Sequence, residues 1–297
     1  MRKKHLIIFT LITPLLFSCN FGGNSSEIYT GVVEGTVVRV PALTGGKINS
    51  LLIDTGDQVT KGQLLATIDT LELSYQQQNL QAMLLEIDNQ RQIATTNLGR
   101  SKKELAYITE KYQRFEDLLK TQSVTQQAVD DLKNQLQNAE AAYQTARQQL
   151  GSIDAKRMQI EAQLQSIHKK IADATITAPL GGVITEKFYE AGEAIPPLGS
   201  LAEIIDLKNV WVKIYISEKK LPLIKTGQEA QIHPDGISEY LTGTIGWINS
   251  RAEFTPKTIL TDETRTSLVY AVKVYITNED GVLKEGMPVT VHLNPGN

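Results

Sequence analysis

The stretch GKINSLLIDTGDQVTKGQLLATID, residues 46–69, decides the fold, because it returns later in the chain as GVITEKFYEAGEAIPPLGSLAEIID, residues 182–206. In each copy the second glycine lies ten positions after the first, an acid follows it, and an apolar run ends at an aspartate. Short β-branched runs between glycines are typical of strands joined by turns. The repeat therefore predicts two similar β halves that bracket the intervening segment and can close on each other. The turns are expected to place these glycines at positive φ: Gly46, Gly56, Gly62, Gly182, Gly192 and Gly199.

The segment between the two copies predicts two long helices. Apolar residues recur in alternating steps of four and three from Leu73 to Leu119, and again from Val129 to Ile171. This spacing is the a/d seam of a coiled coil whose heptad positions are lettered a to g. The polar stretch KTQSVT, residues 120–125, separates the runs, and Ser123 or Thr125 can cap the second helix. The chain is therefore expected to fold back into an antiparallel hairpin.

The expected register of this hairpin brings charges onto its seam. If the helices fold about the turn, positions whose numbers add to about 248 face each other, which places Arg91 near Arg157. Two explanations of these arginines are open. They can form a polar layer that fixes the register, or they can be solvated side chains that snorkel off a thin seam. Gly99 and Gly151 fall at one level, and a helix glycine costs roughly 1 kcal/mol relative to alanine, so a bend is expected there. Acids close enough in sequence to compensate the arginines are Glu86, Asp88, Asp154 and Glu161.

Short alternating strands separated by Gly, Pro and Asn/Asp turns fill residues 208–297, for example VWVKIYI at 210–216 and SLVYAVKVYI at 267–276. About five or six strands without helical periodicity predict a small β-barrel. The expected fold class is therefore α+β: a long antiparallel coiled-coil α-hairpin inserted in a split β-sandwich, followed by a small β-barrel domain.

The chain begins like an exported protein. Residues 1–18 join a basic start to an apolar run of 12 residues, Leu6–Phe17, which is too short for a spanning helix of about 20 residues. We expect a cleaved signal peptide. Cys19, the only cysteine, follows directly, and its position resembles the lipobox of bacterial lipoproteins, in which that cysteine carries the lipid anchor. The Gly/Ser/Asn-rich residues 19–26 are expected to tether the folded body flexibly; an ordinary signal peptide with a nearby thiol is the alternative.

Composition argues against several functional classes. The 30 Lys and Arg residues against 33 Asp and Glu residues give a net charge of −3, which disfavours a nucleic-acid binder. One cysteine and four scattered histidines offer no metal-ligand spacing, so no metal is expected. The chain lacks a GxxxxGK[ST] phosphate loop. We therefore expect no cofactor and no enzyme, because the candidate acids lie in glycine turns where solvated carboxylates are expected: Asp54, Asp57, Glu190 and Glu193.

The split β-sandwich interrupted by a hairpin resembles the HlyD family of periplasmic adaptor subunits, or membrane fusion proteins. The phrase ATITAPLGG (174–182) resembles the family's return strand into the lipoyl half, and LKEGMPV (283–289) resembles its closing barrel phrase. A lipoyl carrier is disfavoured, because the hairpin replaces the turn that would hold the modifiable lysine. The resemblance implies these domains: a lipoyl-like domain in two halves at 27–70 and 173–207, the hairpin at 71–172, and the barrel at 208–297.

The resemblance also implies a function and partners. Such an adaptor bridges an inner-membrane transporter to a TolC-like outer-membrane channel, forms a homo-oligomer of six copies, and here would stand in the periplasm, lipid-anchored to the inner membrane. Residues 252–257 (AEFTPK) with Arg265, and a chain ending directly after the barrel, resemble adaptors of ABC-type exporters; an RND-type pump is the alternative. Near the hairpin tip, Arg114, Leu118 and Thr125 match the spacing of the family's Arg, Leu and Ser channel-contact pattern, with Thr in place of Ser.

A different class of protein also accounts for part of the pattern. A structural coiled-coil lipoprotein could space the envelope without any transport role, although it would have no need for two lipoyl halves. In that case Arg114 is a solvated helix residue, Leu118 fills the seam, and Thr125 only caps a helix.

Overall fold

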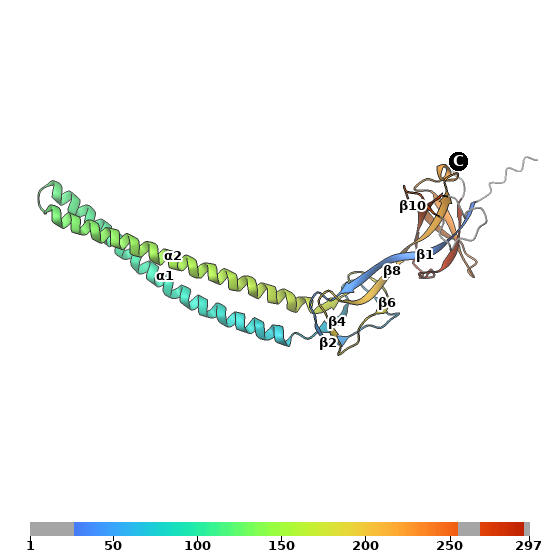
Figure 1. Cartoon of the computed structure of the whole chain (residues 1–297), viewed down its shortest axis with the longest axis horizontal. Coiled ribbons are helices and arrows are strands. Elements are labelled where there is room, and N and C mark those ends of the chain that lie inside the picture. The colour runs from blue at the N-terminus through green and yellow to red at the C-terminus, as the bar shows by residue number, and fades with distance from the viewer. Residues whose placement is uncertain (1–26, 255–267, 294–297) are drawn as a thin grey trace, which may run out of the picture. The chain divides into compact units, whose positions relative to one another are not determined.

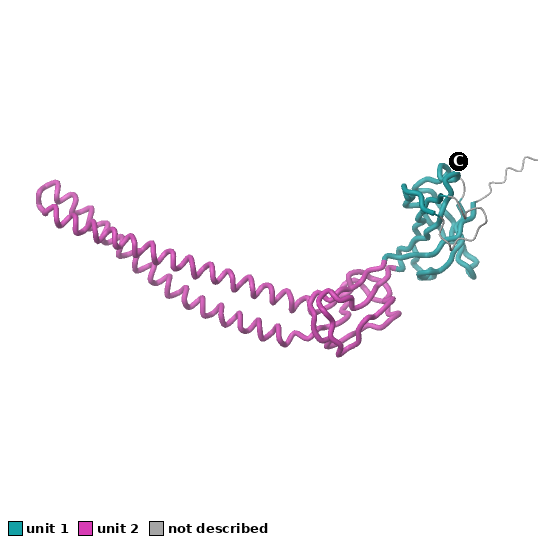
Figure 2. Tube along the Cα trace, in the orientation of Figure 1, with its two compact units in different colours: residues 1–36, 207–297 teal, residues 37–206 magenta. Residues whose placement is uncertain are grey.

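The computed structural model describes residues 27–254 and 268–293. These residues form two compact units, drawn in different colours in Figure 2. One unit is Val37–Asp206, and the other combines the chain up to Thr36 with the chain from Leu207 onward. The long strands β1 (Glu27–Pro41) and β8 (Ser200–Ser217) supply residues to both units.

The first unit contains a small β-sandwich built from both copies of the sequence repeat. One sheet has the strand order β5-β4-β2-β7, and strand β6 pairs with β3 and with β8. Branched residues from both copies fill the core, among them Ile48, Leu65, Ile184 and Ile195, each at most 1% exposed. The strands are β2 (Gly46–Leu51), β3 (Gln58–Val59), β4 (Leu64–Ile68), β5 (Thr175–Thr177), β6 (Gly182–Lys187) and β7 (Ala194–Ile195).

The two copies of the repeat exchange matching backbone hydrogen bonds. Strand β3 of the first copy pairs with β6 of the second, and β7 of the second pairs with β2 of the first. Each copy therefore completes the other, as the internal repeat predicts. The bonds around these pairs also match: Gly192 N–H to Ile48 O and Ile48 N–H to Glu193 O, against Gly56 N–H to Ile184 O and Ile184 N–H to Asp57 O, all between 2.8 and 2.9 Å.

The repeat glycines serve two different purposes. Gly56 and Gly192 both have a φ of 94°, which confirms the expected positive-φ turn. For Gly182 the expectation of positive φ is wrong: a Cβ there would lie 2.1 Å from the carbonyl oxygen of Ile205, so close approach of strand β8 requires the glycine. The expectation is also wrong for Gly199, because the positive φ falls one residue earlier, on Leu198.

The helices α1 (Leu71–Lys120) and α2 (Gln126–Asp173) run side by side as an antiparallel hairpin (Figure 1). Both helices continue without interruption through Gly99 and Gly151. Among the described residues, no helix is long and apolar enough to cross a membrane. The residues buried between the helices all belong to the predicted seam, which confirms the coiled-coil pattern: Ile87, Ala94, Ile108, Val129, Leu132, Ile160 and Ile167.

Polar pairs across the hairpin report its register. Gln77 Nε2 lies 2.9 Å from His168 Nε2. The residue numbers of this pair add to 245, as do those of the ion pairs that join Asp88 to Arg157 and Arg91 to Asp154. The polar pairs therefore lie within one helical turn of the register expected from the sequence.

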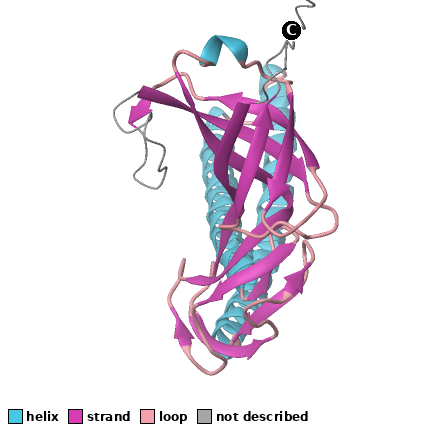
Figure 3. Ribbon diagram, turned by 90° about the vertical axis from the view of Figure 1, so that its right-hand side faces the viewer, coloured by secondary structure: helices cyan, strands magenta, loops and turns pink. Residues whose placement is uncertain are grey.

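The second unit is a closed barrel of six strands. Strands β8, β12, β10, β9, β13 and β1 follow one another, and β12 pairs with both β10 and β8. The 3₁₀ turn η1 (Leu221–Leu223) is the short helical segment at the top of Figure 3. Branched residues such as Ile214, Ile232 and Val274 fill the interior. The remaining strands are β9 (Glu229–Pro234), β10 (Leu241–Ile248), β11 (Glu253–Phe254), β12 (Leu268–Thr277) and β13 (Pro288–Leu293).

Candidate docking site at the hairpin tip

The last residues of α1 accept hydrogen bonds from the turn that joins the two helices. The carbonyl oxygen of Leu118 accepts a bond of 2.9 Å from the hydroxyl of Thr121 and one of 3.0 Å from the N–H of Ser123. Gln122 adopts a φ of 57°, and its N–H donates to the carbonyl of Leu119 at 2.9 Å. This left-handed residue reverses the chain just after the helix ends. The tip is therefore a short, internally bonded turn.

Thr125 caps the N-terminus of α2. Its backbone is extended, and its Oγ1 accepts a hydrogen bond of 3.3 Å from the N–H of Ala128. Of the two residues expected to cap, the structure selects Thr125, whereas the Ser123 hydroxyl lies 3.0 Å from that of Thr121. A cap of this kind is worth about 0.5–2 kcal/mol. The cap uses a lone pair of the oxygen, which leaves the hydroxyl hydrogen of this exposed residue available to another acceptor.

Arg114 and Leu118 lie one helical turn apart on α1. Leu118 is 37% exposed and does not belong to the seam, whereas the seam residues Phe115 and Leu119 beside it are more covered. The Arg114 guanidinium donates to Glu110 at 2.7 Å, and both side chains are exposed. An exposed pair four residues apart contributes only about 0.2–0.5 kcal/mol. Arg114 can therefore exchange Glu110 for an acceptor on a partner at little cost.

The structure brings the three predicted contact residues to the same end of the hairpin, with two on the last turns of α1 and Thr125 at the start of α2. The residues that shape the turn itself were not predicted from the sequence. The hydroxyls of Thr121 and Ser123 could have suggested side-chain bonds to the helix end. Gln122 carries no such signal, because positive φ is uncommon for residues other than glycine.

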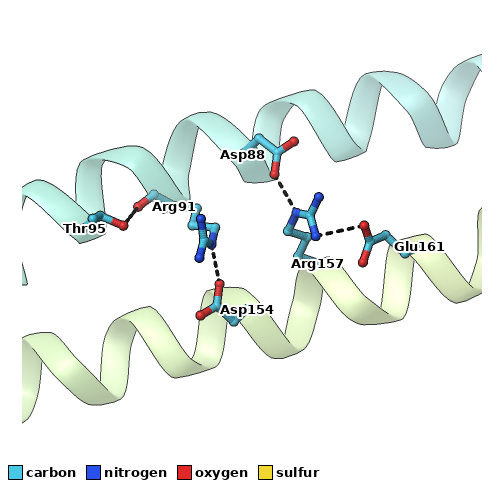
Figure 4. A network of polar contacts seen from close by, with 6 residues as sticks. All are labelled: Asp88, Arg91, Thr95, Asp154, Arg157 and Glu161. Atoms are coloured by element: carbon cyan, nitrogen blue, oxygen red, sulfur yellow. Dashed lines mark hydrogen bonds and ion pairs between the residues drawn. The ribbon is translucent and has the colours of Figure 1, made fainter.

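The two seam arginines bind carboxylates of the opposite helix (Figure 4). Arg91 Nε donates to Asp154 at 2.6 Å, and Arg157 Nε donates to Asp88 at 2.7 Å. Arg157 also contacts Glu161 at 2.8 Å. The bond to Asp88, followed by the charge of Glu161, raises the pKa of Arg157. The arginines thus join the helices rather than snorkel apart, which favours the polar layer that fixes the register.

The acids of the glycine turns have structural partners. Asp57 accepts from the N–H of Asp54 at 2.7 Å, and Glu193 accepts from the N–H of Glu190 at 2.9 Å, so each acid closes its own turn. Lys187 bridges the repeat copies through Glu190 at 2.9 Å and Asp54 at 3.1 Å, and these bonds raise its pKa. A bond from the N–H of the next residue, with Lys187 second, lowers the pKa of Asp54. These contacts give each of the four acids a structural role in its turn.

A cleft of about 680 Å³ opens where the hairpin meets the sandwich. Its charged lining residues carry both signs, and none of the turn acids belongs to it: Lys47, Asp69, Glu72 and Lys170. The described part of the chain holds no group of three or more His, Cys, Asp or Glu side chains that could bind a metal ion. Cys19 and the signal segment lie outside the described residues, as do residues 255–257 and Arg265.

Aromatic and basic side chains gather on one side of the barrel unit. The Lys273 ammonium lies 4.0 Å from the ring centre of Trp211 and 5.9 Å from that of Trp247. The Trp211 ring lies 6.1 Å from Tyr275, and its Nε1–H donates to Glu34 at 2.8 Å. Trp247 and Tyr275 remain 40% and 44% exposed. Exposed aromatic residues beside cations are enriched where proteins bind one another.

Comparison with known proteins agrees with this architecture. Residues 36–205, more than half of the chain, match the family described as RND MFP, barrel-sandwich hybrid domain. A UPF0194 membrane protein of Acidithiobacillus ferridurans is 30% identical over 97% of this chain and 93% of its own length. A UPF0194 membrane protein of Enterobacter sp. (strain 638) is 28% identical over 99% of this chain and 98% of its own.

Among solved structures, MacA from Actinobacillus actinomycetemcomitans superimposes with a TM-score of 0.66 and 21% identity, covering 90% of this chain and 78% of that one. At this identity the likeness speaks for the fold. Together with the family match, the mutually completed sandwich and the inserted hairpin identify the chain as a member of the membrane fusion proteins, the periplasmic adaptors.

Proposed function

We propose that this protein is a lipid-anchored, non-catalytic adaptor of a tripartite export system, bridging an inner-membrane ABC-type transporter to a TolC-like outer-membrane channel. The observation that carries the proposal is the insertion of two long helices into a sandwich whose halves complete each other. Such a rod holds a docking tip far from its base. Helices of 50 and 48 residues, at ~1.5 Å per residue, reach about 70–75 Å.

The tip would contact the channel through Arg114, Leu118 and Thr125. Its hydrogen-bonded turn supports this role, because the bonds to the Leu118 carbonyl hold that backbone at the end of the rod, and the Leu118 side chain is 37% exposed there. Arg114 would supply a charge-assisted bond and Leu118 an apolar contact, while the Thr125 hydroxyl would donate to the channel. The alternative is that Arg114 is only a solvated helix residue, Leu118 only fills the seam and Thr125 only caps α2.

The base of the system would combine the split lipoyl-like sandwich, the barrel and the lipid on Cys19. The sandwich domains would lie side by side in a ring of six copies, and the hairpins would form a tube. The aromatic cluster around Lys273 is the barrel surface best suited to a protein partner. An HlyD-type adaptor of an ABC exporter is favoured by the phrase AEFTPK, residues 252–257. An RND-type pump is the second candidate, and the description of the matching family favours it.

Crosslinking from the barrel identifies the class of transporter. A photoreactive phenylalanine derivative would replace Tyr275 in the aromatic cluster, and Tyr240 at a separate exposed site, in cells that make the full-length protein. The proposal predicts that Tyr275→photoprobe captures an ABC-type membrane subunit. Capture of an RND pump would show that the partner is of the RND type and not of the ABC type. If neither Tyr275 nor Tyr240 captures a transporter of either class, the bridging role is contradicted and the structural lipoprotein is favoured.

A further inference from the structure

One end of the barrel unit is the end at which strand β1 begins and strand β8 ends. Glu27, the first residue of β1, forms an ion pair with Lys220 in the loop that follows β8. Strands β8 and β9 are not neighbours in the barrel, and Ile224 of the loop between them belongs to the barrel core. The loop, residues 218–228, therefore crosses this end and closes it. We call this surface the β1 end; it consists of residues 27–28, 218–229, 249–254 and 268–269.

Large apolar side chains are exposed at the β1 end. Phe254 is 83% exposed, and Leu268, which pairs with it across strands β11 and β12, is 46% exposed. Strand β12 begins opposite the last residue of β8, so this pair lies beside the start of the crossing loop. Leu223 in that loop is 50% exposed, and Ile28 is 62% exposed. Single exposed apolar residues are common, but large ones gathered at one end of a small barrel indicate a contact surface.

The charged residues of the β1 end do not favour either sign. Glu27 is paired with Lys220, and Glu253 accepts a hydrogen bond of 2.7 Å from Asn249. Because four cations and four acids lie at this end in the described part of the chain, its attraction to a strongly charged partner is weak. Recognition must therefore come mainly from the apolar side chains. The charged residues are Lys219, Lys220, Lys225, Arg251, Glu27, Glu218, Glu229 and Glu253.

The sequence places the expected lipid anchor near the β1 end. Glu27, the first residue of β1, comes eight positions after Cys19. A fully extended chain spans at most ~3.3–3.6 Å per residue, so this stretch reaches no further than about 29 Å. If Cys19 carries the lipid, the start of β1 cannot lie further than this from the bilayer surface. A lipid bilayer is therefore the nearest large apolar partner that the β1 end can meet.

We propose that the β1 end rests on the surface of the lipid bilayer, with Leu223, Phe254 and Leu268 among the headgroups. The inference rests on the proposed lipid anchor at Cys19 and adds a second contact of the chain with the same membrane. Leucine and phenylalanine are side chains with which interfacial segments enter the boundary between headgroups and acyl chains. The lysines of this end can keep their ammonium groups at the level of the phosphates while their apolar stems follow the surface.

This contact would orient the barrel. A lipid on a flexible Gly/Ser/Asn-rich tether holds a protein near the membrane but leaves it free to rotate. With its β1 end on the bilayer, the barrel turns its wall sideways. The aromatic cluster around Lys273 lies on that wall, on strands β8, β10 and β12, and would then face a neighbouring membrane protein.

Photocrosslinking to labelled lipid tests this contact. Full-length protein with a photoreactive phenylalanine derivative at Phe254, or at Leu223 on a separate element, would be made in cells grown with radioactive phosphate, which labels phospholipids, and then irradiated. Tyr240 is the matched control, because it is an aromatic residue with 53% exposure in the turn between β9 and β10, at the opposite end of the barrel. We expect phospholipid adducts from Phe254→photoprobe and Leu223→photoprobe, and none from Tyr240→photoprobe or from unirradiated cells.

Purified full-length protein in vesicles separates apolar insertion from attraction between charges. Vesicles of phosphatidylcholine alone and vesicles with added phosphatidylglycerol should give equal yields of the adduct at Phe254, because the charges of the β1 end balance. Adducts in the anionic vesicles alone would overturn the assignment of the contact to the apolar side chains.

Two results in cells would overturn the membrane contact itself: equal lipid adducts from Phe254 and Tyr240, or capture of protein in place of lipid at both Phe254 and Leu223. Labelling of Cys19 with fatty acid is measured separately. If Cys19 is labelled but neither probe at the β1 end gives a lipid adduct, only the inference fails. If Cys19 carries no fatty acid while the adducts persist, the contact of the barrel stands and the proposed anchor fails.

Discussion

Replacing Gly182 of the repeat should show whether a glycine is needed there because another strand lies close to it, and not because of the geometry of a turn. A Cβ at Gly182 would lie 2.1 Å from the carbonyl oxygen of Ile205 and 2.8 Å from its carbonyl carbon. Both atoms belong to backbone, so no side-chain rotation can relieve the clash. Gly182→Ala must therefore move strand β6 away from β8, where Val183 pairs with Ile205.

The size of the effect follows from that distance. A Cβ atom essentially never lies closer than 3.0 Å to another heavy atom, and the distance here would be 2.1 Å, so one strand must shift by about 1 Å. Overpacking of this kind typically costs 1–3 kcal/mol, and we expect about 3 kcal/mol because the obstruction is backbone. Gly181→Ala is the matched control: the nearest atom to its Cβ is 3.5 Å away, and its φ is not in the left-handed region. This variant should stabilise by about 0.4–1 kcal/mol, since alanine restricts the unfolded chain.

Native-state hydrogen exchange of peptides from β6 and β8 measures the local opening free energy directly. A cost of 3 kcal/mol corresponds to more than a hundredfold rise in the opening equilibrium, at about 1.4 kcal/mol per tenfold. Gly182→Ala should lose protection by that factor while Gly181→Ala keeps it. Equal protection in the two variants would refute the close-approach explanation.

Three further predictions concern other parts of the chain. Gly151→Ala should raise the free energy of unfolding of the hairpin by about 1 kcal/mol in urea titrations, because alanine favours the helix over glycine and its Cβ would meet no atom within 4 Å. Burial, followed by the charge of Glu27, raises the pKa of Tyr29 to about 12. The folded state therefore binds this proton more tightly than the unfolded state, so the contribution of Tyr29 to stability is complete below pH 10 and is lost from pH 10 toward 12. Tyr29→Phe should flatten that part of the curve of unfolding free energy against pH. Cys19→Ser should abolish incorporation of labelled fatty acid and release the protein from membranes, whereas retention of the label would place the lipid elsewhere.

The helical hairpin and the two β halves were predictable, because the hairpin has a heptad pattern of apolar residues and the halves share a sequence repeat. The seam from Leu73 to Leu119 and its partner repeat every seven residues, and the structure buries residues of those positions. The exchange of strands between the repeat copies followed from their similarity. The close approach at Gly182 did not, because a sequence does not reveal which strand will lie against a glycine.

The site was predictable to a different degree. Thr125 could be identified as a capping candidate, but choosing it over Ser123 required the geometry of the turn. The exposed apolar side chains of α1 were not predicted, because they are scattered between the seam positions and their exposure becomes clear only once the partner helix is placed: Leu71, Tyr75, Leu85, Ile93 and Tyr107. Partner identity depends on the shape of another protein, which this chain does not encode.

The bridging role itself is tested most directly at the tip. A photoreactive residue would replace Leu118, and as a matched control Glu104, which occupies the same heptad position two heptads further from the tip and is also exposed. After irradiation of cells, crosslinked products would be identified by mass spectrometry. Channel docking at the tip predicts an outer-membrane channel protein captured from position 118 and not from 104. Capture of only the protein itself at both positions would contradict channel docking.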